Sequence, residues 1–177
     1  MREIVLPDNA KPALEWVNGR ALQKVSPRRE HALAQGRFFA ALDAWARKHR
    51  RGTVGTEWRF QVKPPGEVRR SLVPDVAFLS YERMPRRLQR IISVPRCSPD
   101  AVVEVSSPGD RRADMEEKVR VYLQAGTAVV FEVDPRRKIV AIRDVRETRI
   151  ARKTGVVTHD SLPGFKMWVR FLFEPEP

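Results

Sequence analysis

Three charged side chains occupy positions where a globular protein rarely places a charge. Glu104 interrupts a run of alanine and valine, and Asp75 stands at the start of another apolar run. Lys118 follows Met115 by three residues and precedes Tyr122 by four, so these side chains share one face of a predicted helix. Because buried charges are rare unless they are paired, hydrogen-bonded or bound to a metal, we expect chemistry at these positions.

Two carboxylates and a lysine are the groups that metal-assisted hydrolysis of a phosphodiester requires. A divalent cation polarises the phosphate and activates a water, and Mg²⁺ prefers oxygen ligands, often one or two carboxylates. A lysine then orients the water or offsets the developing charge. Asp75 and Glu104 on neighbouring strands, with Lys118 on the helix after the second strand, would supply these groups.

Each of these residues also has a purely structural interpretation. Asp75 equally suits a turn or the entry of a strand, and Glu104 suits a structural acid bound to a neighbouring arginine. Lys118 could pair only with Asp114 at i, i+4, an interaction worth a few tenths of a kcal/mol on an exposed face. The apolar residues that flank Lys118 favour a partly buried lysine instead.

A hairpin and a helix precede these residues in the chain. Residues 14–17 and 20–25 form two strand-like runs around Asn18-Gly19, a dipeptide that favours a type I′ turn. Ser26 then suits the N-cap of a helix, and Pro27 suits its first position.

The predicted helix, which ends near Gly52, turns two polar residues toward the site. At helical spacing its apolar stripe consists of Phe38, Leu42 and Trp45. Extending this stripe backwards reaches Gln35 and His31, which therefore face the same way. His31 also suits a simple hydrogen-bonding role at the start of a helix.

The rest of the chain alternates strand-like and helix-like segments. Residues 54–62 alternate as a half-buried strand with Glu57 on its solvated side, and residues 72–79 form an apolar strand. Residues 100–133 have the order and length of a strand–helix–strand unit. The remaining segments are an antiparallel pair at 138–143 and 148–152, a turn at 162–165 and a last apolar segment at 167–173. These elements predict an α/β or mixed α+β fold.

Length and composition limit the class of protein. The 177 residues suit a single domain, residues 1–177. The chain has no apolar run near the roughly 20 residues of a membrane span, and its N-terminus lacks the apolar segment of a signal peptide. Cys97 is the only cysteine, which excludes an internal disulfide and gives no zinc-site spacing. We therefore expect a soluble cytoplasmic protein without a membrane partner.

The charge is strongly basic, with 34 lysines and arginines against 22 acids and a formal net charge of +12. This balance favours a polyanionic partner, usually nucleic acid, and an arginine-rich genome or a solubility effect is the alternative. The connection at residues 81–99 is basic, with a helical stretch near residues 86–92. Its arginines suit phosphate contacts, or else belong to a solvated loop. They are Arg83, Arg86, Arg87, Arg90 and Arg96.

In this order the motifs resemble the Uma-type branch of the restriction-endonuclease-like proteins, within the PD-(D/E)XK nuclease superfamily. The resemblance covers most of the chain and depends on the whole series, since each fragment alone is unspecific. The motifs are Asn18-Gly19, Ser26-Pro27 with His31, and residues 74–78, 100–108, 114–118, 122–126, 133–135 and 162–165.

The resemblance implies a mixed central sheet flanked by helices and a Mg²⁺-dependent nuclease site, with Mn²⁺ as an alternative metal. Asp75 matches the acid of the PD motif and Glu104 matches the (D/E) acid, so both would bind the metal. The usual lysine two residues after the second acid is replaced by Ser106, and Lys118 matches a lysine moved to the following helix.

Four further residues take secondary places in this comparison. Ser106 is on the same predicted strand face as Glu104 and would edge the site. His31 and Gln35 match a helix that runs past the site in related folds, which implies a supporting role. Glu132 stands where the family has an apolar residue, and is either an edge-strand charge or an additional ligand.

Three hypotheses about function follow. The first is an endonuclease that hydrolyses phosphodiester bonds in DNA and forms a homodimer, as many relatives do. The second is a nuclease-like scaffold that binds nucleic acid through its basic surface and cuts slowly or not at all. The third is a structural or regulatory dimer whose basic charge is incidental. Salt-dependent binding to DNA separates the third hypothesis from the other two.

Overall fold

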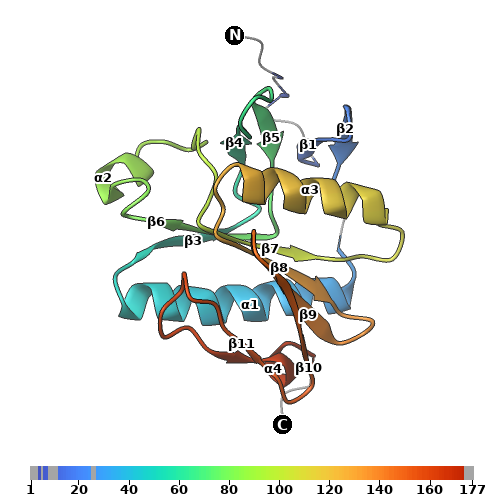
Figure 1. Ribbon diagram of the computed structural model, residues 1–177. Coiled ribbons are helices and arrows are strands. Elements are labelled where there is room, and N and C mark those ends of the chain that lie inside the picture. The colour runs from blue at the N-terminus through green and yellow to red at the C-terminus, as the bar shows by residue number, and fades with distance from the viewer. Residues whose placement is uncertain (1–3, 5, 8–11, 25–26, 174–177) are drawn as a thin grey trace.

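A six-stranded mixed sheet forms the centre of the protein (Figure 1). The computed structural model describes residues 4, 6–7, 12–24 and 27–173. In spatial order the strands are β10 (Thr148–Arg152), β9 (Ile139–Arg143), β8 (Val129–Asp134), β7 (Ala101–Val105), β6 (Val76–Ser80) and β3 (Gly52–Thr56). The pair β7–β8 is parallel and the other neighbours are antiparallel.

Helices cover both faces of this sheet (Figure 1). One face packs on α1 (Arg29–Lys48), α4 (Val169–Phe173) and the short pair β11 (Val156–Val157) and β12 (Met167–Trp168). The other face packs on α3 (Arg112–Gln124) and two hairpins. The hairpins are β1 (Leu14–Val17) with β2 (Arg20–Gln23), and β4 (Phe60–Val62) with β5 (Arg70–Leu72). The predicted mixed α/β class, with its N-terminal hairpin and antiparallel C-terminal strands, is confirmed.

Strand β7 separates two hydrophobic cores because its side chains alternate between the faces of the sheet. Val103 and Val105 pack in the core under α1, whereas Val102 packs in the core under α3. Glu104 follows the phase of Val102 and therefore points toward α3. The parallel pairing of β7 with β8 across α3 confirms the predicted strand–helix–strand unit.

The N-terminal hairpin is confirmed, and the start of α1 differs from the prediction. Asn18 and Gly19 have φ values of 48° and 73°, as a type I′ turn requires. Residues 25 and 26, including the predicted N-cap Ser26, lie outside the described residues. Pro27 precedes the helix, whose first residue is Arg29. Helix α1 ends at Lys48, before the predicted end near Gly52, and Gly52 opens β3 instead.

Two predicted strands are each divided by the structure. Residues 54–62 belong to β3 and β4, which lie in different sheets, and the chain turns at Glu57 with φ of 51°. Residues 72–79 belong to β5 and β6, with Pro74 in the break. Proline lacks the N–H that a central strand donates, so the break falls there. Asp75 consequently lies at the entry of β6, and continuing the register of Val76 with Val103 sets it opposite Glu104.

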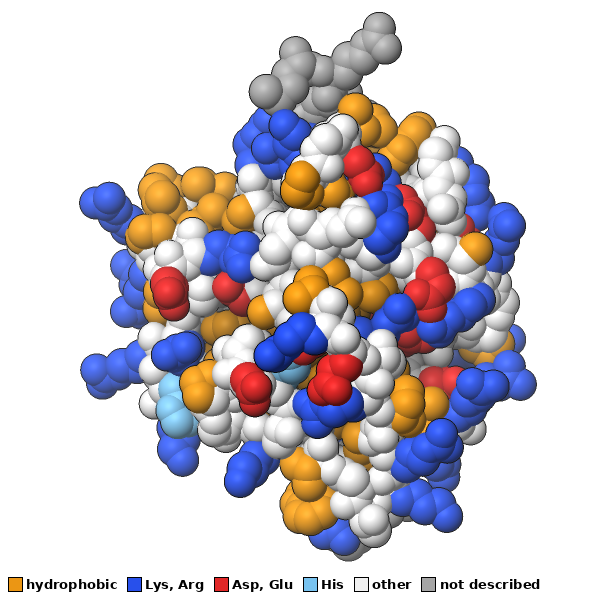
Figure 2. Space-filling model, in the orientation of Figure 1, with side chains coloured by type: hydrophobic (Ala, Val, Ile, Leu, Met, Phe, Trp, Pro, Cys, Tyr) orange, Lys and Arg blue, Asp and Glu red, His pale blue; other side chains and the backbone are white. Residues whose placement is uncertain are grey.

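The basic connection after β6 contains one short helix, α2 (Arg86–Gln89), shorter than predicted. Lysine and arginine side chains are spread over the face in Figure 2 and around its margin, mixed with acidic ones. In the part of the chain that the structure describes, no helix has both the length and the apolar character of a membrane span.

Close packing at Gly52 gives a test of the fold. A Cβ atom at this position would lie 2.2 Å from the Leu79 carbonyl oxygen and 2.6 Å from Phe78 Cε2, both on the neighbouring strand β6. We expect Gly52→Ala to lower the free energy of unfolding by about 3 kcal/mol, measured by urea denaturation.

Gly36 provides a matched control in α1, because a Cβ atom there would meet nothing within 4 Å. Gly36→Ala is expected to raise the stability by about 0.5–1 kcal/mol, since alanine favours the helix. A Gly52→Ala protein as stable as the wild type would contradict the observed pairing of β3 with β6.

Candidate active site

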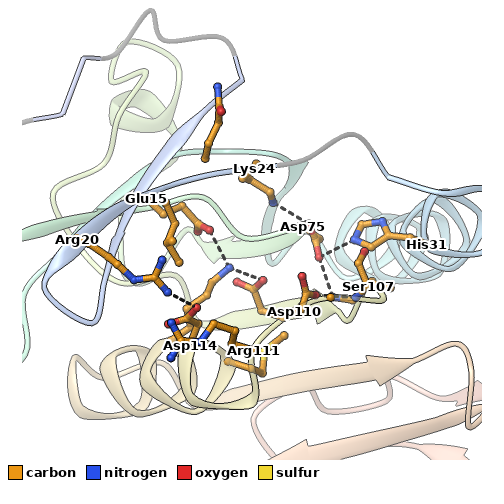
Figure 3. A pocket seen from close by; sticks show the side chains of 16 residues that line it. Glu15, Arg20, Lys24, His31, Asp75, Ser107, Asp110, Arg111 and Asp114 are labelled. Atoms are coloured by element: carbon orange, nitrogen blue, oxygen red, sulfur yellow. Dashed lines mark hydrogen bonds and ion pairs between the residues drawn. The ribbon is translucent and has the colours of Figure 1, made fainter.

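A solvent-open pocket of about 310 Å³ lies between the β1–β2 hairpin, the end of β7 and the start of α3 (Figure 3). Asp75, Glu104 and Lys118 all line it, so the structure brings the three predicted site residues together. Arg20, Lys24 and Arg111 add cationic side chains to the wall, and Asp110 and Asp114 add acidic ones.

Asp75 is held by three donors from three directions. Lys24 Nζ lies 2.7 Å from Oδ1, while the Val105 backbone N–H donates to Oδ2 at 2.7 Å. His31 Nε2 lies 3.3 Å from the same Oδ2, and Figure 3 shows Lys24 and His31 approaching Asp75 from opposite sides. Burial alone would raise the pKa of Asp75, but the hydrogen bond from His31 and the charge of Lys24 hold it well below its usual value. The side chain is therefore an ionised, fixed carboxylate.

Glu104 and Lys118 form a buried pair on the α3 side of the sheet. Lys118 Nζ lies 2.6 Å from Glu104 Oε2, and these residues are only 8% and 2% exposed. Glu104 Oε1 is buried and has no hydrogen-bond partner among the described residues. Burial raises the pKa of Glu104 to about 8, although the Lys118 ammonium opposes the shift. The side chain of Tyr122 is fully buried close to Glu104, and its pKa is raised chiefly by burial and also by the charge of Glu104.

Glu15 is a third buried acid of the site, and it lies on β1 of the hairpin. Its Oε2 accepts from Lys118 Nζ at 3.1 Å, and its Oε1 accepts from the Val73 backbone N–H at 2.7 Å. Burial alone would lower the pKa of Lys118, but the carboxylates of Glu104 and Glu15 outweigh burial and hold this pKa above its usual value. The ammonium of Lys118 therefore keeps its proton. Glu104, whose pKa is raised by burial, is the member of the Glu104–Lys118 pair that changes its protonation.

The head of α1 supports Asp75 from the other side of the pocket. Gln35 Nε2 donates to the Asp75 carbonyl oxygen at 3.0 Å and lies 3.3 Å from Glu57 Oε1. His31 is buried and contacts the Asp75 carboxylate, as described above. Glu57 is about half exposed, as predicted, but its Oε1 also lies 3.3 Å from Lys24 Nζ.

The family of the chain follows from its sequence as a whole. The model of a family described as Uma2, "putative restriction endonuclease", matches residues 3–170. The chain belongs to the Uma2 family. Comparison with curated proteins gives no match. A crystal structure of a "putative nuclease" from Anabaena variabilis is 23% identical, with a TM-score of 0.82 over 95% of this chain and 93% of that chain. At this identity the likeness shows the fold, and it agrees with the predicted restriction-endonuclease-like architecture.

Two residues of this Uma2 chain were missed by sequence reasoning, namely Glu15 and Lys24. Glu15 lies between Leu14 and Trp16, which are more apolar, so alternation alone would place the face with Glu15 in solvent. Instead Glu15 and Val17 face inward. The rule that singled out Glu104, a charge within an apolar run, would have found Glu15 as well. Lys24 has no comparable local signal.

Ser106 does not edge the site as predicted. Strand β7 ends at Val105, so the alternation of faces does not extend to Ser106. Its hydroxyl donates to the Val133 carbonyl oxygen at 3.2 Å, and it lines a neighbouring pocket with His31. Val105 and Ser107 line the site in its place.

The five arginines predicted to bind nucleic acid lie away from the pocket. Their connection follows the Ser80 end of β6, whereas Asp75 precedes the opposite end of that strand. Arg83 Nε lies 2.9 Å from Asp100 Oδ1, and its guanidinium also donates to the Gly126 carbonyl oxygen at 2.7 Å. None of the five is among the described residues that line the pocket.

Asp114 and Glu132, which had alternative interpretations in the sequence, contact other side chains than those predicted. Asp114 accepts from Asn18 Nδ2 at 2.8 Å and from Arg20 at 2.7 Å, so the proposed pairing of Asp114 with Lys118 is not formed. Glu132 lies on β8 inside the sheet, and its oxygens contact Arg112 and Arg143. Glu132 is therefore neither an edge-strand charge nor directed at the site.

The carboxylates of the pocket fit a hard divalent cation whose remaining ligands are water molecules and oxygen atoms of the substrate. Among the described residues, no group of three or more His, Cys, Asp or Glu side chains is arranged to hold a metal. Mg²⁺ in phosphate-processing sites is commonly bound by only one or two carboxylates. The unpartnered Glu104 Oε1 and the ionised Asp75 line the same pocket and meet that requirement.

Proposed function

We propose that this protein is a Mg²⁺-dependent endonuclease that hydrolyses phosphodiester bonds in DNA, with Mn²⁺ as an alternative metal. The observation that carries the proposal is the meeting of Asp75, Glu104 and Lys118 in one open pocket of a Uma2-family chain. When bound, the cation would polarise the phosphate and lower the pKa of an attacking water.

Each side chain has a distinct role in this proposal. Asp75 and Glu104 hold the cation through carboxylate oxygens. Lys118 orients the attacking water or offsets charge that develops on the phosphate, and Glu15 fixes the ammonium 3.1 Å from its own carboxylate. His31 keeps the Asp75 carboxylate in one orientation.

The partners belong to the same proposal. A net charge of +12 supports a polyanionic substrate, because basic surfaces attract nucleic acid and speed its association. A homodimer is proposed along with it, to be tested by analytical ultracentrifugation.

Asp75→Asn provides the test of this function. We expect the wild type to nick or cut plasmid DNA with Mg²⁺ or Mn²⁺ and to lose this activity in excess chelator. Asp75→Asn should be inactive with both metals while its circular dichroism spectrum stays native. Cleavage by Asp75→Asn at the wild-type rate would remove Asp75 from the site and refute the two-carboxylate assignment.

A second candidate is a nuclease-like module that binds nucleic acid without cutting it. One observation favours it: Lys24 and Lys118 already form ion pairs with Asp75 and Glu104. This candidate requires salt-dependent DNA binding that survives Asp75→Asn and Glu104→Gln, together with no cleavage by the wild type in any divalent metal.

A further inference from the structure

We propose that Lys24 is a phosphate-binding residue of the site, which pairs with Asp75 only while no divalent cation is bound there. The inference rests on the proposed function, because it requires a cation at Asp75. The inference adds a second lysine to the site. The ammonium of this lysine contacts Asp75 without a cation and a phosphate of the nucleic acid when the cation is bound.

Lys24 is a partly buried counter-ion of Asp75. Its Nζ lies 2.7 Å from Asp75 Oδ1 and donates to the Val73 carbonyl oxygen at 2.9 Å. The side chain of Asp75 is 4% exposed and that of Lys24 is 16% exposed. The ammonium therefore occupies the open side of an oxygen that a cation would need.

Two positive charges cannot share this oxygen without a large repulsion. At separations of about 4 Å, unit charges interact strongly even in the partly screened interior of a protein, and a divalent ion doubles the effect. Asp75 Oδ2 already accepts from the Val105 N–H and contacts His31, so Oδ1 is the oxygen with one partner to exchange. Lys24 must leave Oδ1 for a cation to bind well.

The Glu57 carboxylate offers the Lys24 ammonium a second partner. Glu57 Oε1 lies 3.3 Å from Lys24 Nζ, and the Glu57 side chain is 47% exposed. Lys24, His31 and Asp75 line both the site pocket and an adjoining pocket of about 360 Å³ that Glu57 also lines. An ammonium that leaves Asp75 thus stays at the junction of two open pockets, where a nucleic-acid phosphate can reach it.

The first test measures the affinity for Mn²⁺ alone by isothermal titration calorimetry. Lys24→Met removes the competing charge, so it should bind Mn²⁺ at least about tenfold more tightly than the wild type. Lys48→Met removes an exposed lysine at the far end of α1 and should leave the affinity unchanged.

Equal or weaker Mn²⁺ binding by Lys24→Met than by the wild type would overturn the inference. If the wild type binds Mn²⁺ and Asp75→Asn does not, the proposed function stands whatever Lys24→Met does. If neither the wild type nor Lys24→Met binds Mn²⁺, the proposed function and this inference both fail. Lys24→Gln, which keeps a donor for the Val73 carbonyl oxygen, replaces Lys24→Met if that variant does not fold.

The second test detects the new phosphate contact. Binding to a short double-stranded oligonucleotide is measured against salt concentration, once with Ca²⁺ and once with chelator. With Ca²⁺, the slope of log affinity against log salt should be smaller in Lys24→Met than in the wild type by about 0.9, the value for one phosphate contact. With chelator the two slopes should agree, because Lys24 then remains on Asp75. Equal slopes in Ca²⁺ would contradict the proposal.

Discussion

Lys118→Met is expected to lower the free energy of unfolding by about 3–5 kcal/mol, the largest loss we expect from any single change in the site. Lys118 Nζ lies 2.6 Å from Glu104 and 3.1 Å from Glu15, and all three residues are buried. Removing the ammonium leaves the Glu15 and Glu104 side chains in a low-dielectric interior without their common hydrogen-bond donor, and Glu104, whose pKa burial raises to about 8, keeps its proton at neutral pH. The expected loss reflects the cost of leaving buried polar groups without their donor more than the strength of the ion pairs.

The measurement is urea denaturation at neutral pH in the presence of chelator. Lys48→Met, the same change at an exposed position of a helix, should alter stability by no more than about 0.5 kcal/mol. Adding Glu104→Gln to Lys118→Met should recover part of the loss, because a buried acid that has lost its donor is replaced by a neutral amide with donors of its own. Purely additive effects in this double-mutant cycle would show that Lys118 and Glu104 do not interact.

Local patterns predicted the elements that carry most of the site. Asn18-Gly19 defined the hairpin because only a few dipeptides adopt positive φ at both positions of its turn. The stripe of α1 led back to Gln35 and His31, both of which contact Asp75. A charge within an apolar run led to Glu104, and a charge between apolar residues on one helix face led to Lys118. In each case, the signal lies within one helix or strand.

The contacts that the sequence did not reveal join elements far apart in the chain. Lys24 meets Asp75 and Glu15 meets Lys118 only after the β1–β2 hairpin packs across the entry of β6 and the face of α3. Alternation along β1 could not show which face turns inward, since Leu14 and Trp16 are more apolar than Glu15. The inward face carries Val17, which is fully buried in the core under α3, as well as Glu15 with its partner Lys118.

The divided strands have physical causes of two kinds. Pro74 carries its own signal, since a proline within an apolar run argues against a continuous central strand. The turn at Glu57 has no such signal, because a non-glycine residue with φ of 51° is held there by its surroundings. Its backbone N–H donates to the Asp75 carbonyl oxygen at 3.3 Å, which ties this turn to the site.

Glu104→Gln is expected to stop DNA cleavage while making the metal-free protein more stable at high pH. The folded-state pKa of Glu104 is raised from 4.5 to about 8, chiefly by burial. A raised pKa means that the native state binds this proton more tightly than the unfolded chain does. The stability linked to the proton is therefore complete below about pH 4.5 and is lost as the pH rises to about 8.

Glutamine cannot ionise, so Glu104→Gln should not show this loss. Measured with chelator, its gain over the wild type should be small near pH 5 and should reach the order of 3 kcal/mol near pH 9. Glu117→Gln is the control on the same helix as Lys118, since its acid lies near the surface and has a lowered pKa. A gain that does not change with pH would mean that Glu104 is ionised in the native state throughout this range. A gain in the stability of Glu104→Gln that grows with pH, together with the loss of cleavage, would identify Glu104 as an acid that serves the function of the protein and lowers its stability.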